Sequence, residues 1–313
     1  MLQVINQDLQ MTNLDIGRVL AQINTELQTC QNTWAISSLR FLSSGLEFVV
    51  CRARSERFGM VVIKSPWERW IHNDNDSNID ARELLEQEAL LLSHARNHDL
   101  PAPEMLALHF GARCDFLITS FVETDNSSPS PRQMGELLNR LHRLAPPAFT
   151  PVAQRGARLP EVLSERMLRR ANVVSRISGT QIEMPSRPAL LRLIAQVDRK
   201  DCLLHMDFRA ANLLVRERDI KGIIDWSNAL VGDPSFELAR IAEYGHLDSD
   251  FVAGYGTQFP LAFLPRRVEL AYRLDAAVML AVVFLSESPN RERARIQIKR
   301  VGDLSAELCN EFC

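Results

Sequence analysis

Several features that would indicate a membrane, secreted or nucleic-acid-binding protein are missing from the 313-residue chain. No run of 18 or more apolar residues lacks charges, so the sequence predicts no transmembrane helix. The first residues, MLQVINQDLQ, have neither the basic nor the apolar region of a signal peptide. The formal net charge of -3 is far from the basic excess that is typical of nucleic-acid surfaces. We therefore expect a cytoplasmic protein that binds neither a membrane nor a nucleic acid.

Paired cysteines and internal repeats are also missing. The six cysteines include no C-x-x-C pair and are scattered, at positions 30, 51, 114, 202, 309 and 313. This spacing favours reduced thiols over a disulfide framework or a zinc site. The hydrophobic content of 46% and the charged content of 24% are those of a soluble globular protein. A monomer or a homodimer is expected.

The pattern of apolar residues divides the chain near residue 125. A helix is predicted over 12–28 and a longer one over 81–98. Five strands are predicted in the same part, at 38–45, 47–54 and 58–64 and as two strands within 108–122. The polar stretch 65–80 between them is predicted to be a flexible insertion. We expect residues 1–124 to form an N-terminal lobe with a leading helix, an antiparallel sheet, a second helix and a hinge.

The remaining residues, 125–313, are predicted to form a larger and mainly helical C-terminal lobe. The expected helices are 132–144, 159–177, 187–197, 234–244, 248–257, 266–287 and 291–311. The predicted strands and helices give an α+β fold class. Two lobes are expected because 313 residues are too many for one ordinary core.

The stretch LLHMDFRAANLLV, residues 203–215, interrupts an apolar run with polar side chains. Burying such groups costs several kcal/mol unless each finds a partner, so this is either a surface turn or a site of chemistry. The chemistry of phosphoryl transfer fits the spacing. Asp207 can accept the proton of an attacking hydroxyl, while Asn212 and Asp225, at the end of the predicted strand GIID, can hold Mg²⁺. Lys64, at the end of VVIK, can pair with nucleotide phosphates.

These motifs resemble those of the aminoglycoside phosphotransferase and choline kinase superfamily of protein-kinase-like enzymes. The resemblance rests on H-x-D-x-x-x-x-N (205–212), IIDW (223–226) and GDPSFELA (232–239), together with Lys64 and with Glu88 in the following long helix. It implies a protein-kinase-like bilobal fold and an ATP-dependent, Mg²⁺-dependent phosphotransferase that acts on a hydroxyl of a small molecule. Glu88 is chosen over Glu83 and Glu86 because its distance to LPAP resembles the family's spacing.

Two departures from the kinase pattern affect the expected site. The turn SSGLEF carries only Gly45, so backbone N–H groups near this residue must bind phosphate without a G-x-G-x-x-G loop. Arg209 stands two residues after the expected base, where it either neutralises the transferring phosphoryl group or is only a surface charge. Ser120 and Val122, in TSFVE, are expected to meet the nucleotide base through main-chain groups.

Two alternatives to a small-molecule kinase remain. A protein kinase is disfavoured because only seven residues separate Trp226 from Pro234, too few for an activation loop. An inactive, nucleotide-binding pseudokinase is expected to lose Asp207, Asn212 or Asp225, and none is lost. The sequence does not identify the acceptor, but the acids Glu243, Asp248 and Asp250 form one cluster that would suit an amine.

Overall fold

The computed structural model describes residues 13–125, 127–197 and 200–312, which divide into two units. Within these ranges, the first unit is drawn from Met1–His72, Asp76–Ser128 and Ala211–Ser227, and the second from Asn73–Asn75, Pro129–Ala210 and Asn228–Cys313. None of the helices in the described part of the chain has the length and apolarity that crossing a membrane requires. Five cysteines lie in the described ranges and are free thiols, whereas Cys313 lies outside them.

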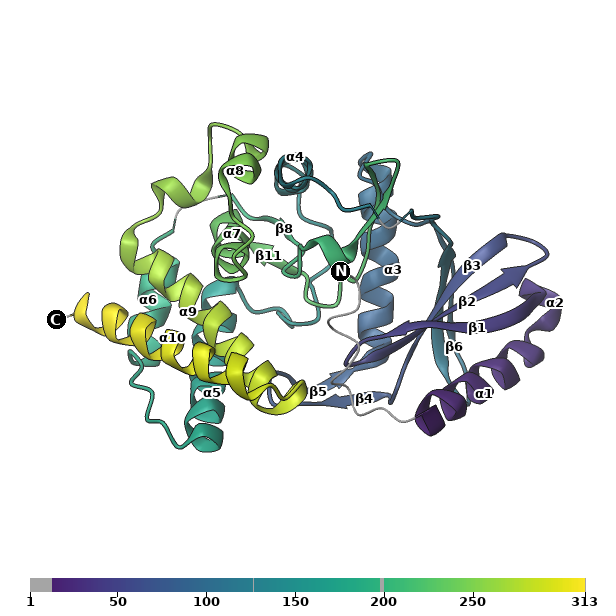
Figure 1. The fold of residues 1–313 in the computed structure, drawn as a ribbon, viewed down its shortest axis with the longest axis horizontal. Coiled ribbons are helices and arrows are strands. Elements are labelled where there is room, and N and C mark those ends of the chain that lie inside the picture. The colour runs from purple at the N-terminus through teal and green to yellow at the C-terminus, as the bar shows by residue number, and fades with distance from the viewer. Residues whose placement is uncertain (1–12, 126, 198–199, 313) are drawn as a thin grey trace. The chain divides into compact units, whose positions relative to one another are not determined.

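The first unit is built on an antiparallel sheet, as the alternating apolar residues predict (Figure 1). Its strands lie in the order β1 (Ile36–Ser44), β2 (Phe48–Ser55), β3 (Gly59–Pro66), β7 (Asp115–Ser120) and β6 (Met105–Phe110). Buried residues of α1 (Asn13–Thr29) pack against inward-facing side chains of the sheet such as Val61 and Ile63. Since side chains alternate along a strand, Lys64 points to the opposite face, where α3 (Ala81–Asn97) lies. The short helix α2 (Gln31–Trp34) follows α1.

The polar stretch 65–80 is not the flexible insertion that the sequence predicted. It contains β4 (Trp70–His72) and β5 (Ser77–Asp80), which pair as an antiparallel hairpin. Asp80 then caps α3, because its carboxylate accepts a hydrogen bond from Arg82 N at 3.0 Å. A second hairpin of this unit pairs β9 (Leu213–Arg216) with β10 (Asp219–Ile223). Its two turn residues, Glu217 and Arg218, both have positive φ, as tight hairpin turns require.

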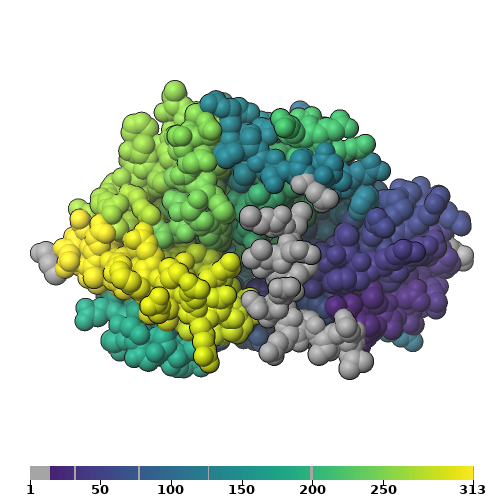
Figure 2. Space-filling view, viewed as in Figure 1, coloured from purple at the N-terminus to yellow at the C-terminus, as the bar shows by residue number. Residues whose placement is uncertain are grey.

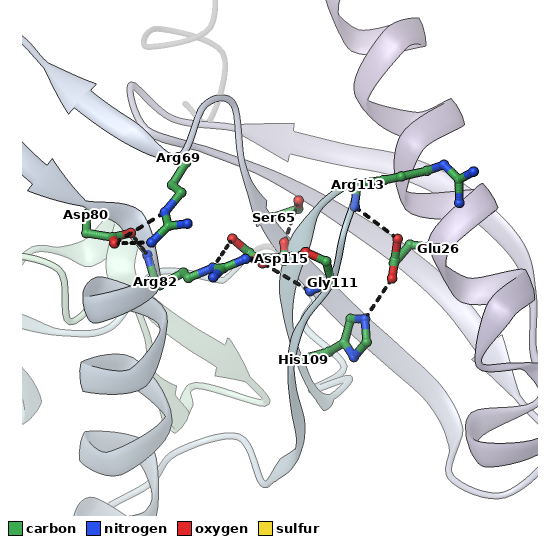
Figure 3. A network of polar contacts seen from close by, with 9 residues as sticks. All are labelled: Glu26, Ser65, Arg69, Asp80, Arg82, His109, Gly111, Arg113 and Asp115. Atoms are coloured by element: carbon green, nitrogen blue, oxygen red, sulfur yellow. Dashed lines mark hydrogen bonds and ion pairs between the residues drawn. The ribbon is translucent and has the colours of Figure 1, made fainter.

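A polar network joins α1 and α3 to the β6–β7 turn (Figure 3). The buried Glu26 accepts hydrogen bonds from His109 Nε2 and Arg113 N at 3.1 and 3.2 Å. Burial favours the neutral acid, yet these donors outweigh that effect and lower the pKa of Glu26. On the other side, Arg82 donates two hydrogen bonds to Asp115 at 2.8 and 2.9 Å. The network thereby anchors the first turn of α3 to the start of β7.

The second unit is mainly helical. Its helices are α4 (Pro131–His142), α5 (Leu159–Ser178), α6 (Arg187–Ala195), α7 (Pro234–Glu243), α8 (Ser249–Tyr255), α9 (Arg266–Val282) and α10 (Arg291–Asn310). A π-helical turn, Val283–Glu287, extends α9. The apolar stripes of α5, α6, α7, α9 and α10 form one core. Two short strands, β8 (Cys202–Leu204) and β11 (Leu230–Gly232), pair within this unit, and β8 leads directly into the segment that begins with His205.

Candidate active site

Lys64 is the central cation of the first unit. Its Nζ atom lies 2.5 Å from Glu88 Oε2 and 3.1 Å from Asp225 Oδ1, and 4.5 Å from the centre of the Phe48 ring. Burial disfavours the ammonium, but the carboxylates of Asp225 and Glu88 outweigh this effect and raise the pKa of Lys64. The side chain is therefore held as a cation. The structure brings together three of the residues that the sequence singled out.

The helix α3 holds the turn around Asp225 through a residue that the sequence analysis missed. Gln87, beside Glu88, is buried and donates from Nε2 to the carbonyl oxygens of Trp226 and Ser227, at 2.7 and 3.3 Å. Its only signal in the sequence was a polar residue at an apolar position of a helix. Phe48 was missed as well, because an aromatic residue in a strand is ordinary core.

Asn212 and Asp225 lie at the open end of the β9–β10 hairpin. The carbonyl oxygen of Asn212, the last residue of a 3-10 turn, accepts a hydrogen bond from Ile224 N at 3.0 Å, so Asn212 lies close to the residue before Asp225. The sequence placed Asp225 at the end of a strand, but β10 ends two residues earlier, at Ile223. The φ of Asp225 is +67°, a left-handed conformation that Asp tolerates better than most residues. The chain therefore turns sharply at the proposed metal ligand.

The donors on this hairpin suit a hard cation. A carboxylate and an amide oxygen are ligands that Mg²⁺ accepts, and Mg²⁺ commonly takes its remaining ligands from phosphates and water. Within the described residues, no group of three or more His, Cys, Asp or Glu side chains is arranged to hold a metal. Asn212 and Asp225 thus fit a magnesium ion that arrives with a nucleotide, rather than a metal site built from protein ligands alone.

The main-chain groups proposed for the nucleotide are already partly used. Gly45 N donates to Phe48 O at 2.9 Å within the β1–β2 turn, so the N–H groups beyond it would have to meet a phosphate. Ser120 N donates to Glu104 O at 2.9 Å, and Phe121 N donates to Met60 O at 3.1 Å. Because these two N–H groups are already used, a nucleotide base at this segment would have to bind the main chain of Val122 or nearby carbonyl oxygens.

The second unit contains the segment His205–Arg209, where the motif predicts a catalytic loop. Asp207 N donates to His205 Nδ1 at 3.2 Å, so the imidazole braces this segment. Arg209 Nε lies 3.1 Å from the carboxylate of Asp207. The guanidinium is therefore more than an isolated surface charge, since it contacts the expected base directly.

Glu237, on α7, binds the main chain of this segment and was not singled out in the sequence analysis. Its carboxylate is fully buried and accepts hydrogen bonds from His205 N at 3.0 Å and Met206 N at 2.6 Å. His142 Nε2 lies 2.9 Å from the same carboxylate. Burial alone would raise the pKa of Glu237, but the hydrogen bond and charge of His142 outweigh burial and lower it. Asp233 caps α7, because its side chain accepts a hydrogen bond from Ser235 N.

The acids that might have bound an amine have other partners in the second unit. Glu243 is bound by Arg273 and Arg300, Asp248 caps α8 by accepting from Phe251 N at 2.8 Å, and Asp250 lies 3.9 Å from Arg132. The structure therefore gives the expected amine-binding cluster no support, and it stays a prediction. The exposed surface of α10, yellow in Figure 2, carries cations such as Arg295 and Lys299.

Comparisons with known proteins bear on the fold and the family of the chain. Comparison with curated protein sequences finds no match. Among solved structures, a choline/ethanolamine kinase family protein from Mesorhizobium loti has a TM-score of 0.58 and 17% identity, over 93% of this chain and 94% of that one. A thermostable mutant of aminoglycoside phosphotransferase APH(4)-Ia, in a ternary complex with AMP-PNP and hygromycin B, has a TM-score of 0.60 and 16% identity, over 91% and 98%.

These likenesses confirm the predicted α+β, protein-kinase-like fold. The gentamicin complex of APH(2″)-IIa adds a further structure of the same fold, with a TM-score of 0.57 and 18% identity over 93% of this chain and 97% of that one. A sequence family described as the phosphotransferase enzyme family matches residues 38–270, which is well over half of the chain. The protein is a member of the phosphotransferase enzyme family.

Proposed function

We propose that the protein transfers the γ-phosphoryl group of ATP to a hydroxyl group of a small molecule. The observation that carries the proposal is the placement of the Lys64 ammonium between the carboxylates of Glu88 and Asp225. A buried cation with one carboxylate on a helix and another on a sharp turn is the arrangement needed to hold nucleotide phosphates. The retained H-x-D-x-x-x-x-N motif supplies the rest of the chemistry.

On the nucleotide side, Lys64 binds the α- and β-phosphates, and Glu88 keeps its ammonium in place. Asn212 and Asp225 would hold Mg²⁺, which would supply positive charge against the β- and γ-phosphates. Backbone groups near Gly45 contact the phosphates, and those of Ser120 and Val122 contact the base. Support for a nucleotide comes from the AMP-PNP named with the structure of similar fold.

On the acceptor side, Asp207 orients the hydroxyl and accepts its proton. The hydroxyl oxygen forms a bond to the γ-phosphorus while the bond from this phosphorus to the β,γ-bridging oxygen breaks, which releases ADP. Arg209, bound to Asp207, neutralises charge on the transferring group. A small acceptor is favoured over a protein because the chain is too short between Trp226 and Pro234 for an activation loop.

The proposal is tested first by an acceptor screen. Consumption of MgATP is measured with amino alcohols, sugars, choline, homoserine and aminoglycosides, including hygromycin B. One acceptor should raise consumption well above the rate with water alone. Binding of ATP without consumption for any acceptor would instead favour the pseudokinase.

The second test replaces Asp207 by Asn, which keeps the size but removes the proton acceptor. Because general-base catalysis contributes about 10²–10⁴-fold, kcat should fall by that factor while ATP binding changes little. Asp303→Asn, at an exposed carboxylate of α10, is the matched control and should keep wild-type turnover. Near wild-type kcat in the Asp207→Asn variant would rule out the proposed mechanism.

A further inference from the structure

Met206, next to the proposed base, has an unusual backbone conformation. Its φ is +64°, which is unfavourable for a large side chain and persists only where the surroundings enforce it. The side chain is buried in the core of the second unit, so the residue cannot relax outward. Something must hold this backbone in place.

Two buried side chains of α7 bind both main-chain groups of Met206. Glu237 Oε1 accepts from Met206 N at 2.6 Å, and Arg240 Nη1 donates to Met206 O at 2.7 Å. Glu237 and Arg240 are three residues apart and therefore share one face of the helix. The peptide groups on either side of the strained residue are thus held by a carboxylate and a guanidinium from the same helix.

Arg240 is itself oriented from α9. Its Nη2 lies 3.5 Å from Asp275 Oδ2, and its guanidinium lies 6.0 Å from the centre of the Phe236 ring. Asp275 is fully buried and also accepts from Arg166 at 2.9 and 2.7 Å. Burial favours the neutral acid, but the nearby arginines outweigh it and hold the pKa of Asp275 at about 2. The carboxylate is therefore charged and fixes the direction of the Arg240 guanidinium.

We infer that Arg240, oriented by Asp275, is a positioning residue for the proposed base. It fixes the carbonyl of Met206 and thereby the position of the Asp207 carboxylate, without contacting either substrate. A contribution to stability alone does not explain why an arginine is buried here, because apolar residues can often replace a buried ion pair without loss of stability. The need to position Asp207 does explain the buried arginine, since a shift of about 1 Å in a catalytic group can lower the rate about 10²-fold. The inference rests on the proposed function only for its kinetic consequence.

The test uses Arg240→Met, which keeps an apolar chain but removes the donor to Met206 O. Hydrogen exchange of the peptide that contains residues 205–207 should become about 10–10²-fold faster, the size expected for the loss of one charge-assisted hydrogen bond. With MgATP and the acceptor found in the screen, kcat should fall about 10–10²-fold while KM for ATP stays nearly constant. Arg240→Lys, which keeps a charge and a donor, should recover most of both losses.

Arg273→Met is the matched control, because Arg273 lies on the same helix as Asp275 and binds Glu243 and Glu269 instead. It should lower the melting temperature without changing exchange at residues 205–207 or kcat. Unchanged local exchange in Arg240→Met, or equal effects in Arg273→Met, would overturn the inference. If Asp207→Asn is fully active, the proposed function fails instead, and the exchange experiment still decides the role of Arg240.

Discussion

At the scale of single residues, the contact of Asp225 with Lys64 and its proposed role at Mg²⁺ both depend on its backbone conformation. The left-handed backbone at this position turns the carboxylate back toward Lys64, and Ser227 Oγ lies 3.3 Å from the same Oδ1 atom. With no nucleotide present, the carboxylate balances the buried ammonium of Lys64. With MgATP, the same group is proposed to hold the metal.

Replacing Asp225 by Ala should therefore abolish Mg²⁺-dependent phosphoryl transfer, because it removes the one carboxylate proposed to bind Mg²⁺. Calorimetry should show that Mg²⁺ no longer strengthens ATP binding in this variant. Lys64→Ala provides the comparison, since it should weaken ATP binding with or without Mg²⁺ and lower turnover. Undiminished Mg²⁺-dependent turnover in Asp225→Ala would remove this residue from the site.

At the scale of helices, two glycines bring α4 and α8 into close contact. A Cβ atom on Gly135 would lie 2.7 Å from Tyr255 N and nearer still to Phe251 O, and one on Gly254 would collide with Arg132 O. The contact has a consequence for the site, because His142 at the end of α4 meets Tyr255 OH at 2.8 Å and also binds Glu237. The two glycines thus help to place His142, which contacts Glu237 next to the segment that contains Asp207.

Gly135→Ala should destabilise the protein by about 1–3 kcal/mol, the usual cost of overpacking, because the obstacle is backbone and cannot move aside. Gly302→Ala is the matched control, since nothing lies within 4 Å of a Cβ at that position of α10. It should stabilise by up to about 1 kcal/mol through helix propensity. Urea denaturation measures the change in the free energy of unfolding for each variant. Changes of the same sign in both would contradict this interpretation of the α4–α8 contact.

At the scale of the whole molecule, buried carboxylates determine how stability responds to acid. The pKa of Asp275 is about 2 in the folded protein, below the value of about 3.9 in an unfolded chain. The pKa of Glu237 is lowered as well. A group whose pKa is depressed by folding stabilises the protein fully above its unfolded pKa, and this stabilisation is lost as pH falls toward the folded pKa.

We therefore expect stability to be lost between about pH 4 and pH 2, with Asp275 contributing roughly 2–3 kcal/mol. Thermal unfolding measured across this range should show the loss, and Asp275→Asn should show a shallower slope. Asp303→Asn, at an exposed carboxylate, should keep the wild-type slope. A slope unchanged in Asp275→Asn would show that this group does not titrate as stated.

The balance of charge also predicts the nature of the acceptor. From Ser235 onward the chain has eleven acids and nine Lys or Arg residues, and Glu243 and Asp248 already have partners. We expect an acceptor with at most one or two positive charges. Its kcat/KM should change little with salt, although the Debye length falls from about 10 Å at 0.1 M to about 3 Å at 1 M. A tenfold or larger fall, with an aminoglycoside as best acceptor, would contradict this.

Most of the secondary structure follows from the sequence, because hydrophobic periodicity acts locally. The predicted helix over 81–98 and the strands near Lys64 lie within a few residues of the observed ones. The hairpin within 65–80 was missed, because its polar strands show no alternation. The choice of Glu88 came from the resemblance to the phosphotransferase family, and the structure brings Glu88 to Lys64.

What surrounds these residues was decided only by the tertiary structure. Gln87, Glu237, Arg240 and Asp275 are ordinary polar residues in helical sequence, and nothing local shows that each is buried. Burial depends on which helix faces pack together, and the partners are distant in the chain: Asp275 lies 35 residues from Arg240 and 109 from Arg166. Sequence spacing specifies which groups can do the chemistry, whereas long-range packing determines how each of them is held and charged.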